Sequence, residues 1–214
     1  MTADVHHARR ERLALCDLFE RVGPDAPTLC EGWTAHDLAA HLVVRERRPD
    51  TAPGLVLGGP AARHTERVRA ETRRTRPFPE LVERIRSGPP FGLGRAAALD
   101  DRMNLHEFFV HHEDVRRANG EGPRTGVDDL QDALWGLLRR SARMLLRRVR
   151  GVGVELARPG GGFLTARSGD RAARLTGEPA ELVLYLFGRQ AVAQVELSGD
   201  ETAVAAVQAS RLGV

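Results

Sequence analysis

The chain has 214 residues, 42% of them hydrophobic, and its 32 basic and 29 acidic side chains leave a net charge of +3. This length and apolar content suffice for one large domain, or for a medium and a small one, and exclude a disordered chain. We expect neither a membrane span nor a signal peptide, because no apolar run approaches ~18 residues and the first twelve residues are polar. The two cysteines, Cys16 and Cys30, are too few for a disulfide framework and favour the reducing cytoplasm.

All 32 basic residues are arginine, which we attribute to a GC-rich coding bias rather than to chemistry. Most of them alternate with acids, as in the segment 63–67, and this pattern favours solvated helix faces. A polyanion site along Arg63 to Arg86 is the alternative, but a nucleic-acid binder usually carries a clustered surplus of positive charge. We therefore do not expect nucleic acid as a partner.

Helical periodicity dominates the first ~150 residues. An apolar stripe predicts a first helix that ends at Gly23 and Pro24, and a near capping box of Thr34 and Asp37 starts a second helix that stops by Pro49. We expect a loop over 49–60, two helical pieces over 61–86 broken near Pro77 and Pro79, and another loop over 88–94.

Two further helices are predicted over 100–118 and 127–149, the latter with five leucines facing inward. Four main helices joined by long crossovers are typical of an up-down bundle, so we assign residues 1–150 to a helical domain.

The composition changes at Gly151, after which short β-type runs alternate with turns. We predict strands at 152–157, 162–166, 172–175 and 195–197, and helices at 178–188 and 201–211. Residues 151–214 would then form a small α+β domain that must dock on the helical domain for stability, since about 60 residues bury little apolar surface. The predicted fold class of the whole chain is α+β.

Histidines give the richest functional signal. We expect His6, His7 and His64 on the surface, because their neighbours are polar. His41 borders the apolar face of the second helix, where a hydrogen-bonded core histidine is the ordinary interpretation.

The helix over 100–118 suggests more, because Glu107 and His111 are spaced i, i+4 and project from one face. With a histidine from a facing helix such as His41, they would close three sides of a metal site and leave a fourth position open, as catalytic zinc requires. The same donors fit a facial iron site, and Asp114 could orient His111 from behind. An ordinary helical Glu–His pair remains the alternative.

Two segments carry a family resemblance. The segment 29–42, LCEGWTAHDLAAHL, resembles the opening signature of the mycothiol-dependent maleylpyruvate isomerase family, and the segment 107–118, EFFVHHEDVRRA, is similar to its Glu-x-x-x-His-x-x-Asp helix. A Leu-x-Gly-Arg-like stretch follows at 186–189, so the resemblance covers most of the chain. The closest likeness is to a metal-binding branch of the family that has no assigned reaction. The long crossovers between the second and third helices depart from the family, so its substrate is not carried over.

The resemblance implies a DinB-like four-helix bundle followed by a small α+β domain. It also implies a divalent metal, usually zinc, held by His41, Glu107 and His111, and mycothiol as a thiol cofactor. The expected activity is a mycothiol-dependent transferase or isomerase reaction, in which a metal-bound thiolate attacks a small electrophilic substrate. The alternative is a non-catalytic metal-binding sensor or scaffold, distinguished by whether the fourth metal position opens into a pocket of a few hundred Å³.

Three further residues near these motifs need assignment. We expect Cys30 to be a buried inert thiol rather than a metal ligand, and Trp33 to pack at the start of the second helix. Arg189 follows Gly188 at a helix end, where a cation interacts favourably with the last carbonyls. Its functional interpretation, as a catalytic residue, is a guanidinium that reaches a substrate carboxylate across the domain interface.

Overall fold

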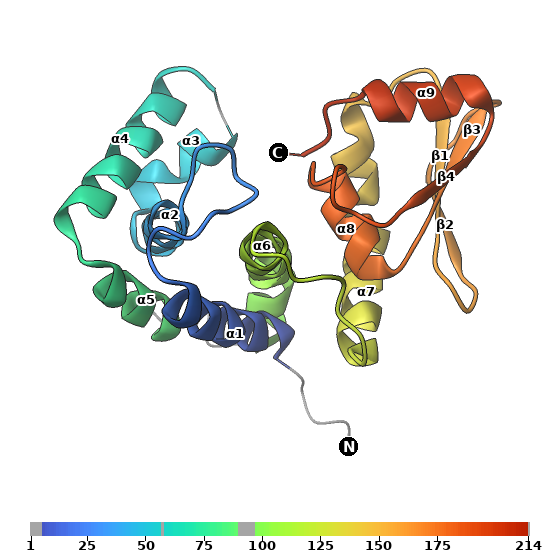
Figure 1. Ribbon diagram of the computed structural model, residues 1–214. Helices are drawn as coiled ribbons and strands as arrows, with labels where there is room; N and C mark the ends of the chain where they lie inside the picture. The colour runs from blue at the N-terminus through green and yellow to red at the C-terminus, as the bar shows by residue number, and fades with distance from the viewer. Residues whose placement is uncertain (1–5, 57, 90–96, 214) are drawn as a thin grey trace. The chain divides into compact units, whose positions relative to one another are not determined.

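The computed structural model describes residues 6–56, 58–89 and 97–213 (Figure 1). The chain divides into two compact units, the first ending at Gly122 and the second beginning at Pro123. Helices make up the first unit, and a four-stranded sheet with helices makes up the second, so the fold is α+β as the sequence predicts. Within the described residues, no helix is long and apolar enough to cross a membrane.

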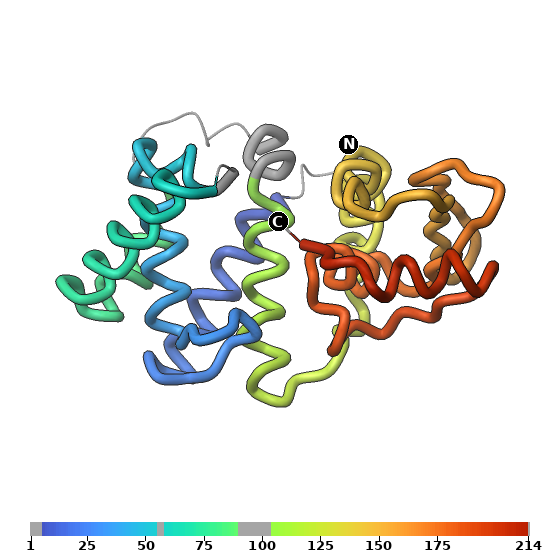
Figure 2. The backbone as a smooth tube through the Cα atoms, turned by 90° about the horizontal axis from the view of Figure 1, so that it is seen from above, coloured from blue at the N-terminus to red at the C-terminus, as the bar shows by residue number. Residues whose placement is uncertain are grey.

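Among its described residues, the first unit contains six α-helices. They are α1 (His7–Val22), α2 (Ala35–Arg47), α3 (Ala52–Val56), α4 (Pro60–Thr75), α5 (Phe78–Arg86) and α6 (Ala97–Ala118). Helix α1 packs against α5 and α6, and α2 packs against α4 and α5. The core between them contains Leu15, Phe19, Leu38, Ile85 and Phe108, all buried. Figure 2 shows α1, α2 and α6 running alongside one another. Cys30 and His41 both have potential ligand atoms close to His111 of α6.

Helix α2 begins where the sequence predicts. The Asp37 carboxylate accepts hydrogen bonds from the Thr34 N–H, at 3.2 Å, and from the Thr34 hydroxyl, at 2.9 Å. It also accepts one from Arg69 of α4 at 2.7 Å, and these contacts hold the pKa of Asp37 below its usual value although burial opposes this. The start of α2 is therefore fixed both by its own cap and by α4.

The segment 49–60 contains helical structure that the sequence analysis did not predict. A 3₁₀ turn over Pro49–Thr51 leads into α3. A Cβ at position 54 would lie 2.1 Å from the Thr65 hydroxyl, so Gly54 is required for the close approach of α3 to α4. Here glycine serves packing between two helices, and its presence misleadingly indicates a loop. Most of the loop expected over 88–94 lies outside the described residues.

The second unit contains α7 (Asp128–Leu145), a 3₁₀ turn (Leu146–Arg148), β1 (Gly153–Ala157), β2 (Phe163–Arg167), β3 (Ala172–Thr176), α8 (Pro179–Leu186), β4 (Glu196–Gly199) and α9 (Glu201–Ala209). The strand order is β2-β1-β3-β4, with β1 and β3 parallel and both outer pairs antiparallel. Helix α9 packs on β3 and β4. All six elements predicted after residue 151 are present, and each begins and ends within two residues of its predicted bounds.

The position of α7 differs from the sequence-based boundary at residue 150. The five predicted inward-facing leucines of α7 are buried, but the helix packs against α8 and β2 and belongs to the second unit. A stripe of leucines indicates that a helix face is buried but not which element covers it. The boundary between the two units falls within the Gly- and Pro-containing segment 119–127.

Candidate metal centre

His41 lies in the middle of α2, at the edge of its buried face. Leu38 and Leu42 are fully buried and anchor α2 in the core, which leaves the His41 ring at the boundary of the core. The Trp33 ring packs against it with 5.2 Å between ring centroids, and the Arg69 guanidinium covers the Trp33 ring at 4.5 Å. The imidazole is thus enclosed by an aromatic side chain that is itself held in place.

Glu107 and His111 lie one turn apart on α6 and meet His41 from the other side. The Glu107 Oε1 atom is 3.2 Å from His41 Nε2 and 3.3 Å from His111 Nε2. The two imidazole rings are 5.3 Å apart between centroids. One potential ligand atom from each of the three residues lies within 4.8 Å of the other two, so the structure brings together the three residues that the sequence analysis grouped.

The carboxylate of Glu107 is the electrostatic centre of this cluster. Besides the two imidazoles it contacts Arg45 Nε at 3.1 Å, and Arg45 in turn donates a hydrogen bond to Asn104 at 2.8 Å. Burial opposes the charged form of Glu107, but contacts with His111, His41 and Arg45 hold its pKa well below the usual value. The sequence analysis did not single out Arg45, although its i, i+4 spacing from His41 was a usable signal.

The pKa values of His41 and His111 shift in opposite directions. Burial lowers the pKa of His41 below its usual value despite the contact with Glu107. Burial also opposes the charged form of His111, but hydrogen bonds with Asp114, Cys30 and Glu107 raise its pKa well above the usual value. His111 lies between two carboxylates, Glu107 and Asp114, and both favour its charged form.

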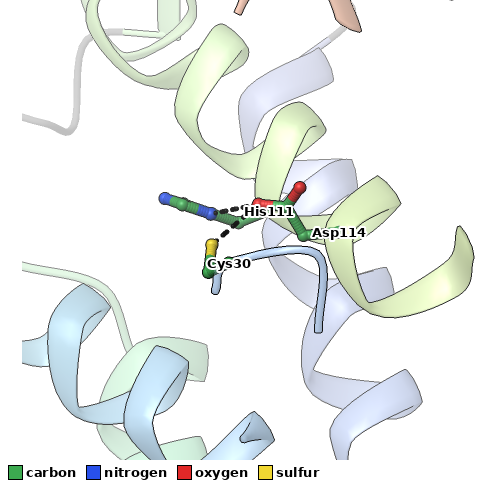
Figure 3. Close-up of side chains that lie close together, drawn as sticks. All are labelled: Cys30, His111 and Asp114. Carbon is green, nitrogen blue, oxygen red and sulfur yellow. Dashed lines mark hydrogen bonds and ion pairs between the residues drawn. The ribbon is translucent and has the colours of Figure 1, made fainter. Parts of the chain in front are cut away.

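Asp114 lies behind His111, as the sequence analysis proposed. Its carboxylate is 2.9 Å from His111 Nδ1, and the residue is completely buried. The Cys30 thiol donates to the same carboxylate oxygen at 3.3 Å (Figure 3). Buried carboxylates in this position fix the tautomer and orientation of a histidine whose other nitrogen is a metal ligand.

The loop that carries Cys30 is attached to α6. The Leu29 N–H donates to the Asp114 carbonyl at 3.1 Å, and the Asn119 side chain donates to the Pro27 carbonyl at 3.1 Å. The expectation of a buried, inert Cys30 is wrong: the residue is partly exposed, and its thiol lies beside His111 because this loop is held against α6. Cys30, His111 and Asp114 also form a second group whose potential ligand atoms lie within 4.8 Å of one another.

The donors of the first group fit a divalent metal. Two imidazole nitrogens and one carboxylate oxygen are the protein ligands of many three-ligand zinc sites. Bonds of about 2.0–2.1 Å in a tetrahedral site separate neighbouring ligand atoms by about 3.3 Å, and the two distances to Glu107 Oε1 are 3.2 and 3.3 Å. The three residues can thus hold such an ion through small side-chain adjustments.

Three other described histidines contact residues outside this cluster. His112 is buried and its Nδ1 lies 3.0 Å from Glu11, on a different side of α6 from His111. His64 pairs with Asp50 at a half-exposed position, as expected for a surface residue. His36 Nε2 lies 3.2 Å from the Arg76 carbonyl. None of these three is in the cluster around Glu107.

Arg189 lies just after α8 in the second unit. Its guanidinium donates to the Phe187 carbonyl at 2.7 Å, and its N–H donates to the Leu184 carbonyl at 2.9 Å. Gly188 makes this turn possible, because its φ is +87° and a Cβ there would lie 2.8 Å from the Leu212 carbonyl oxygen. The contact with the last carbonyls of the helix is the local role considered above, and a substrate-binding role for Arg189 stays a prediction.

The arginines of α4 and α5 largely pair with acids. Arg74 contacts Glu71 at 2.8 Å, Arg76 contacts Glu80 at 2.6 Å, and Arg86 bridges Asp17 and Glu20 at 2.7 Å each. This agrees with the interpretation of the segment 61–86 as ion-paired helix faces.

Comparison with known proteins places the fold. Neither a protein-family model nor a curated protein sequence matches the chain. Two solved structures do: mycothiol-dependent maleylpyruvate isomerase, at 18% identity and a TM-score of 0.59, and a variant of that enzyme in which one histidine is replaced by alanine, at 16% and 0.56. Each match covers 90% of this chain and 90% of the other. The chain therefore shares the fold of that isomerase over most of its length.

Proposed function

We propose that the protein is a metal-dependent, thiol-using enzyme of the mycothiol-dependent maleylpyruvate isomerase family, from its metal-binding branch, acting in the cytoplasm. The observation that carries the proposal is the convergence of His41, Glu107 and His111, with Asp114 behind His111, in a chain that shares that enzyme's fold. In this interpretation residues 1–150 correspond in sequence to the DinB-like bundle of that family, and residues 151–214 correspond to its small α+β domain.

The residues of the site have separate roles in this proposal. His41, Glu107 and His111 hold a divalent ion, which we propose to be zinc and which would stabilise the thiolate of a coordinated mycothiol for attack on a small electrophilic substrate. Asp114 keeps a proton on His111 Nδ1, so that Nε2 faces the ion. Arg45 orients the Glu107 carboxylate. Arg189 is the proposed catalytic contact to a substrate carboxylate.

Elemental analysis of purified, untagged protein tests the metal site. We expect one divalent ion per chain in the wild type, and its loss in His41→Ala and His111→Ala with helical content retained. His106→Ala is the matched control, because His106 neighbours Glu107 but projects about 100° away around the helix and should leave the occupancy intact. Full occupancy in both ligand variants would refute the site.

Replacement of the native metal by Co²⁺ separates the enzyme from a non-catalytic metal-binding sensor or scaffold. A three-ligand site keeps a position for one more donor, so mycothiol should produce a sulfur-to-cobalt charge-transfer band. An unchanged spectrum at saturating mycothiol, with Co²⁺ confirmed in the site, would favour the sensor or scaffold.

The substrate role of Arg189 is tested by Arg189→Lys, which keeps the charge but loses the planar fork and should lower turnover of a carboxylate substrate at unchanged metal content.

A further inference from the structure

The second unit contains a cavity of about 420 Å³ between α7 and β2. Helix α7 packs against β2 within this unit (Figure 1), so both walls belong to one compact body. The polar part of the lining consists of Arg139 and Arg143 from α7 and of Thr165, Arg167 and Ser168 from β2 and its end. The volume lies in the range of small-molecule sites, roughly 300–1,000 Å³.

The lining of this cavity is strongly basic. Three of its side chains are arginines and none is acidic. Arg139 and Arg143 are spaced i, i+4 on α7, where two like charges repel each other. The sequence contains no Asp or Glu from residue 133 to residue 154, so the helix itself supplies no counter-charge.

The three guanidinium groups lack protein partners in the described part of the chain. Neither an ion pair nor a side-chain hydrogen bond joins Arg139, Arg143 or Arg167 to any described residue, and Arg167 Nε is a buried donor without an acceptor. Two arginines elsewhere in the same unit do pair with acids: Arg158 contacts Asp132 at 2.6 Å and Arg174 contacts Glu155 at 2.8 Å. A buried donor left without a partner lowers stability, and an anion in the cavity would satisfy it.

Helix electrostatics explain only part of this arrangement. Arg143 lies in the last turn of α7, where a cation interacts favourably with the carboxyl end of the helix. Arg139 lies more than a turn before the end, and Arg167 lies on a strand, so neither benefits in this way. The convergence of all three on one cavity points to a ligand.

We propose that the cavity between α7 and β2 binds a small anion that carries at least two phosphate or carboxylate charges. The planar guanidinium forks match both groups in geometry, and the hydroxyls of Thr165 and Ser168 add neutral hydrogen-bond donors. The site shares no residue with the histidine cluster of the first unit. It therefore goes beyond the proposed metal-dependent reaction and does not depend on it.

Isothermal titration calorimetry on the full-length chain tests the proposal with pyrophosphate and citrate as probes, in about 0.15 M salt to screen weak surface attraction. We expect saturable binding of at least one probe. The double variant Arg139→Gln/Arg143→Gln and the single variant Arg167→Gln should each weaken binding about tenfold or more, because each removes a charge-assisted contact. Arg140→Gln is the matched control, an exposed arginine on the same helix that does not line the cavity, and should change affinity less than about twofold.

The outcomes separate the ligand classes and can overturn the site. Tighter binding of pyrophosphate identifies a phosphorylated ligand, and tighter binding of citrate a polycarboxylate; either supports the proposal. Absence of binding of both probes at about 10 mM, far above the affinity of a built anion site, would overturn it. Equal weakening by Arg140→Gln would also overturn it, because the surface would then attract anions without a defined site. If Arg167→Gln does not fold, as judged by circular dichroism, the double variant at the two exposed helix positions decides.

Discussion

The buried charged side chains described in the first unit contact partners, whereas the arginines that line the α7–β2 cavity of the second unit have none among the described residues. Glu113 on α6 is almost completely buried and accepts hydrogen bonds from Arg116 at 2.6 Å and Arg117 at 2.7 Å. Arg139 and Arg143 on α7 have no counterpart of this kind among the described residues. Both helices carry adjacent arginines, Arg116 and Arg117 in α6 and Arg139 and Arg140 in α7, so composition does not distinguish them. The positions of the acidic residues distinguish them. An arginine beside a buried acid stabilises the fold, whereas an arginine without one can contact a ligand.

The Glu113→Ala substitution should have the largest effect on stability. It leaves two poorly solvated guanidinium groups without their shared carboxylate, and we expect a loss of about 3–5 kcal/mol in unfolding free energy. Each unit contains one tryptophan, Trp33 or Trp135, so urea unfolding of the first unit can be followed by Trp33 fluorescence in a Trp135→Phe background. Glu71→Ala removes an exposed pair with Arg74 and should cost less than about 1 kcal/mol. Similar losses of unfolding free energy in Glu113→Ala and Glu71→Ala would show that the buried pairing of Glu113 contributes no more to stability than an exposed ion pair.

Asp114→Asn should weaken the proposed metal site by about 10–100-fold in affinity, the range seen when the carboxylate behind a ligating histidine is lost. Competition with a chromophoric chelator measures this directly. Cys30→Ser keeps the carboxylate of Asp114 and its contact with His111, and should therefore have a smaller effect. Unchanged affinity in Asp114→Asn would show that His111 does not need this partner.

Alkaline pH should destabilise the first unit in particular. Cys16 is fully buried, and burial raises the pKa of its thiol from 9.0 to about 12. The unfolded chain loses this proton at lower pH than the folded chain. The contribution of the protonated Cys16 thiol to the unfolding free energy is therefore fully present below pH 9 and is lost as the pH rises from 9 towards 12. At pH 10 the expected loss is about 1.4 kcal/mol. Urea midpoints of wild type and Cys16→Ala at pH 8 and pH 10 measure it, and an identical pH dependence in both would contradict it. The second unit contains no cysteine.

Arg139→Gln/Arg143→Gln should have the smallest effect on stability. Since these two side chains have no partner to lose and repel each other, we expect unfolding free energy to stay constant or to rise by about 0.2–0.5 kcal/mol. Trp135, which lies on α7, reports unfolding of the second unit in a Trp33→Phe background. A loss of more than about 1 kcal/mol would assign these arginines a structural role and weaken the contrast with Glu113.

The elements of the second unit were predictable from local sequence. Short β-type runs separated by glycines define β1, β2 and β3 almost residue by residue, because each strand is bounded by turn residues. The unit to which α7 belongs was not predictable, since its leucine stripe fits any apolar surface. Helix α3 was missed because Gly54 there serves a helix–helix contact.

The sequence analysis grouped the three central residues and placed Asp114 behind His111, but it did not find the contacts made by Cys30 and Arg45. Helical spacing places Glu107 and His111 on one face, and the family resemblance added His41. The hydrogen bond from Cys30 to Asp114 joins residues 84 positions apart in the sequence, and no local pattern encodes it. The same holds for Arg167, whose relation to α7 depends on how β2 packs.

The hydrogen bonds that attach the loop 27–30 to α6 have a consequence for how metal would be exchanged. They fix the loop that leads into α2 against the helix that bears Glu107 and His111, independently of any ion. The conformational entropy lost in ordering the candidate ligands is thus lost when the chain folds and not when an ion binds. Zinc fingers differ, because they are unfolded without metal. If the proposed site binds metal, the protein could therefore release one ion and take up another while remaining folded. The ion bound in the cell would then depend on the supply of each metal as well as on affinity, because affinity alone follows a fixed order among the divalent ions.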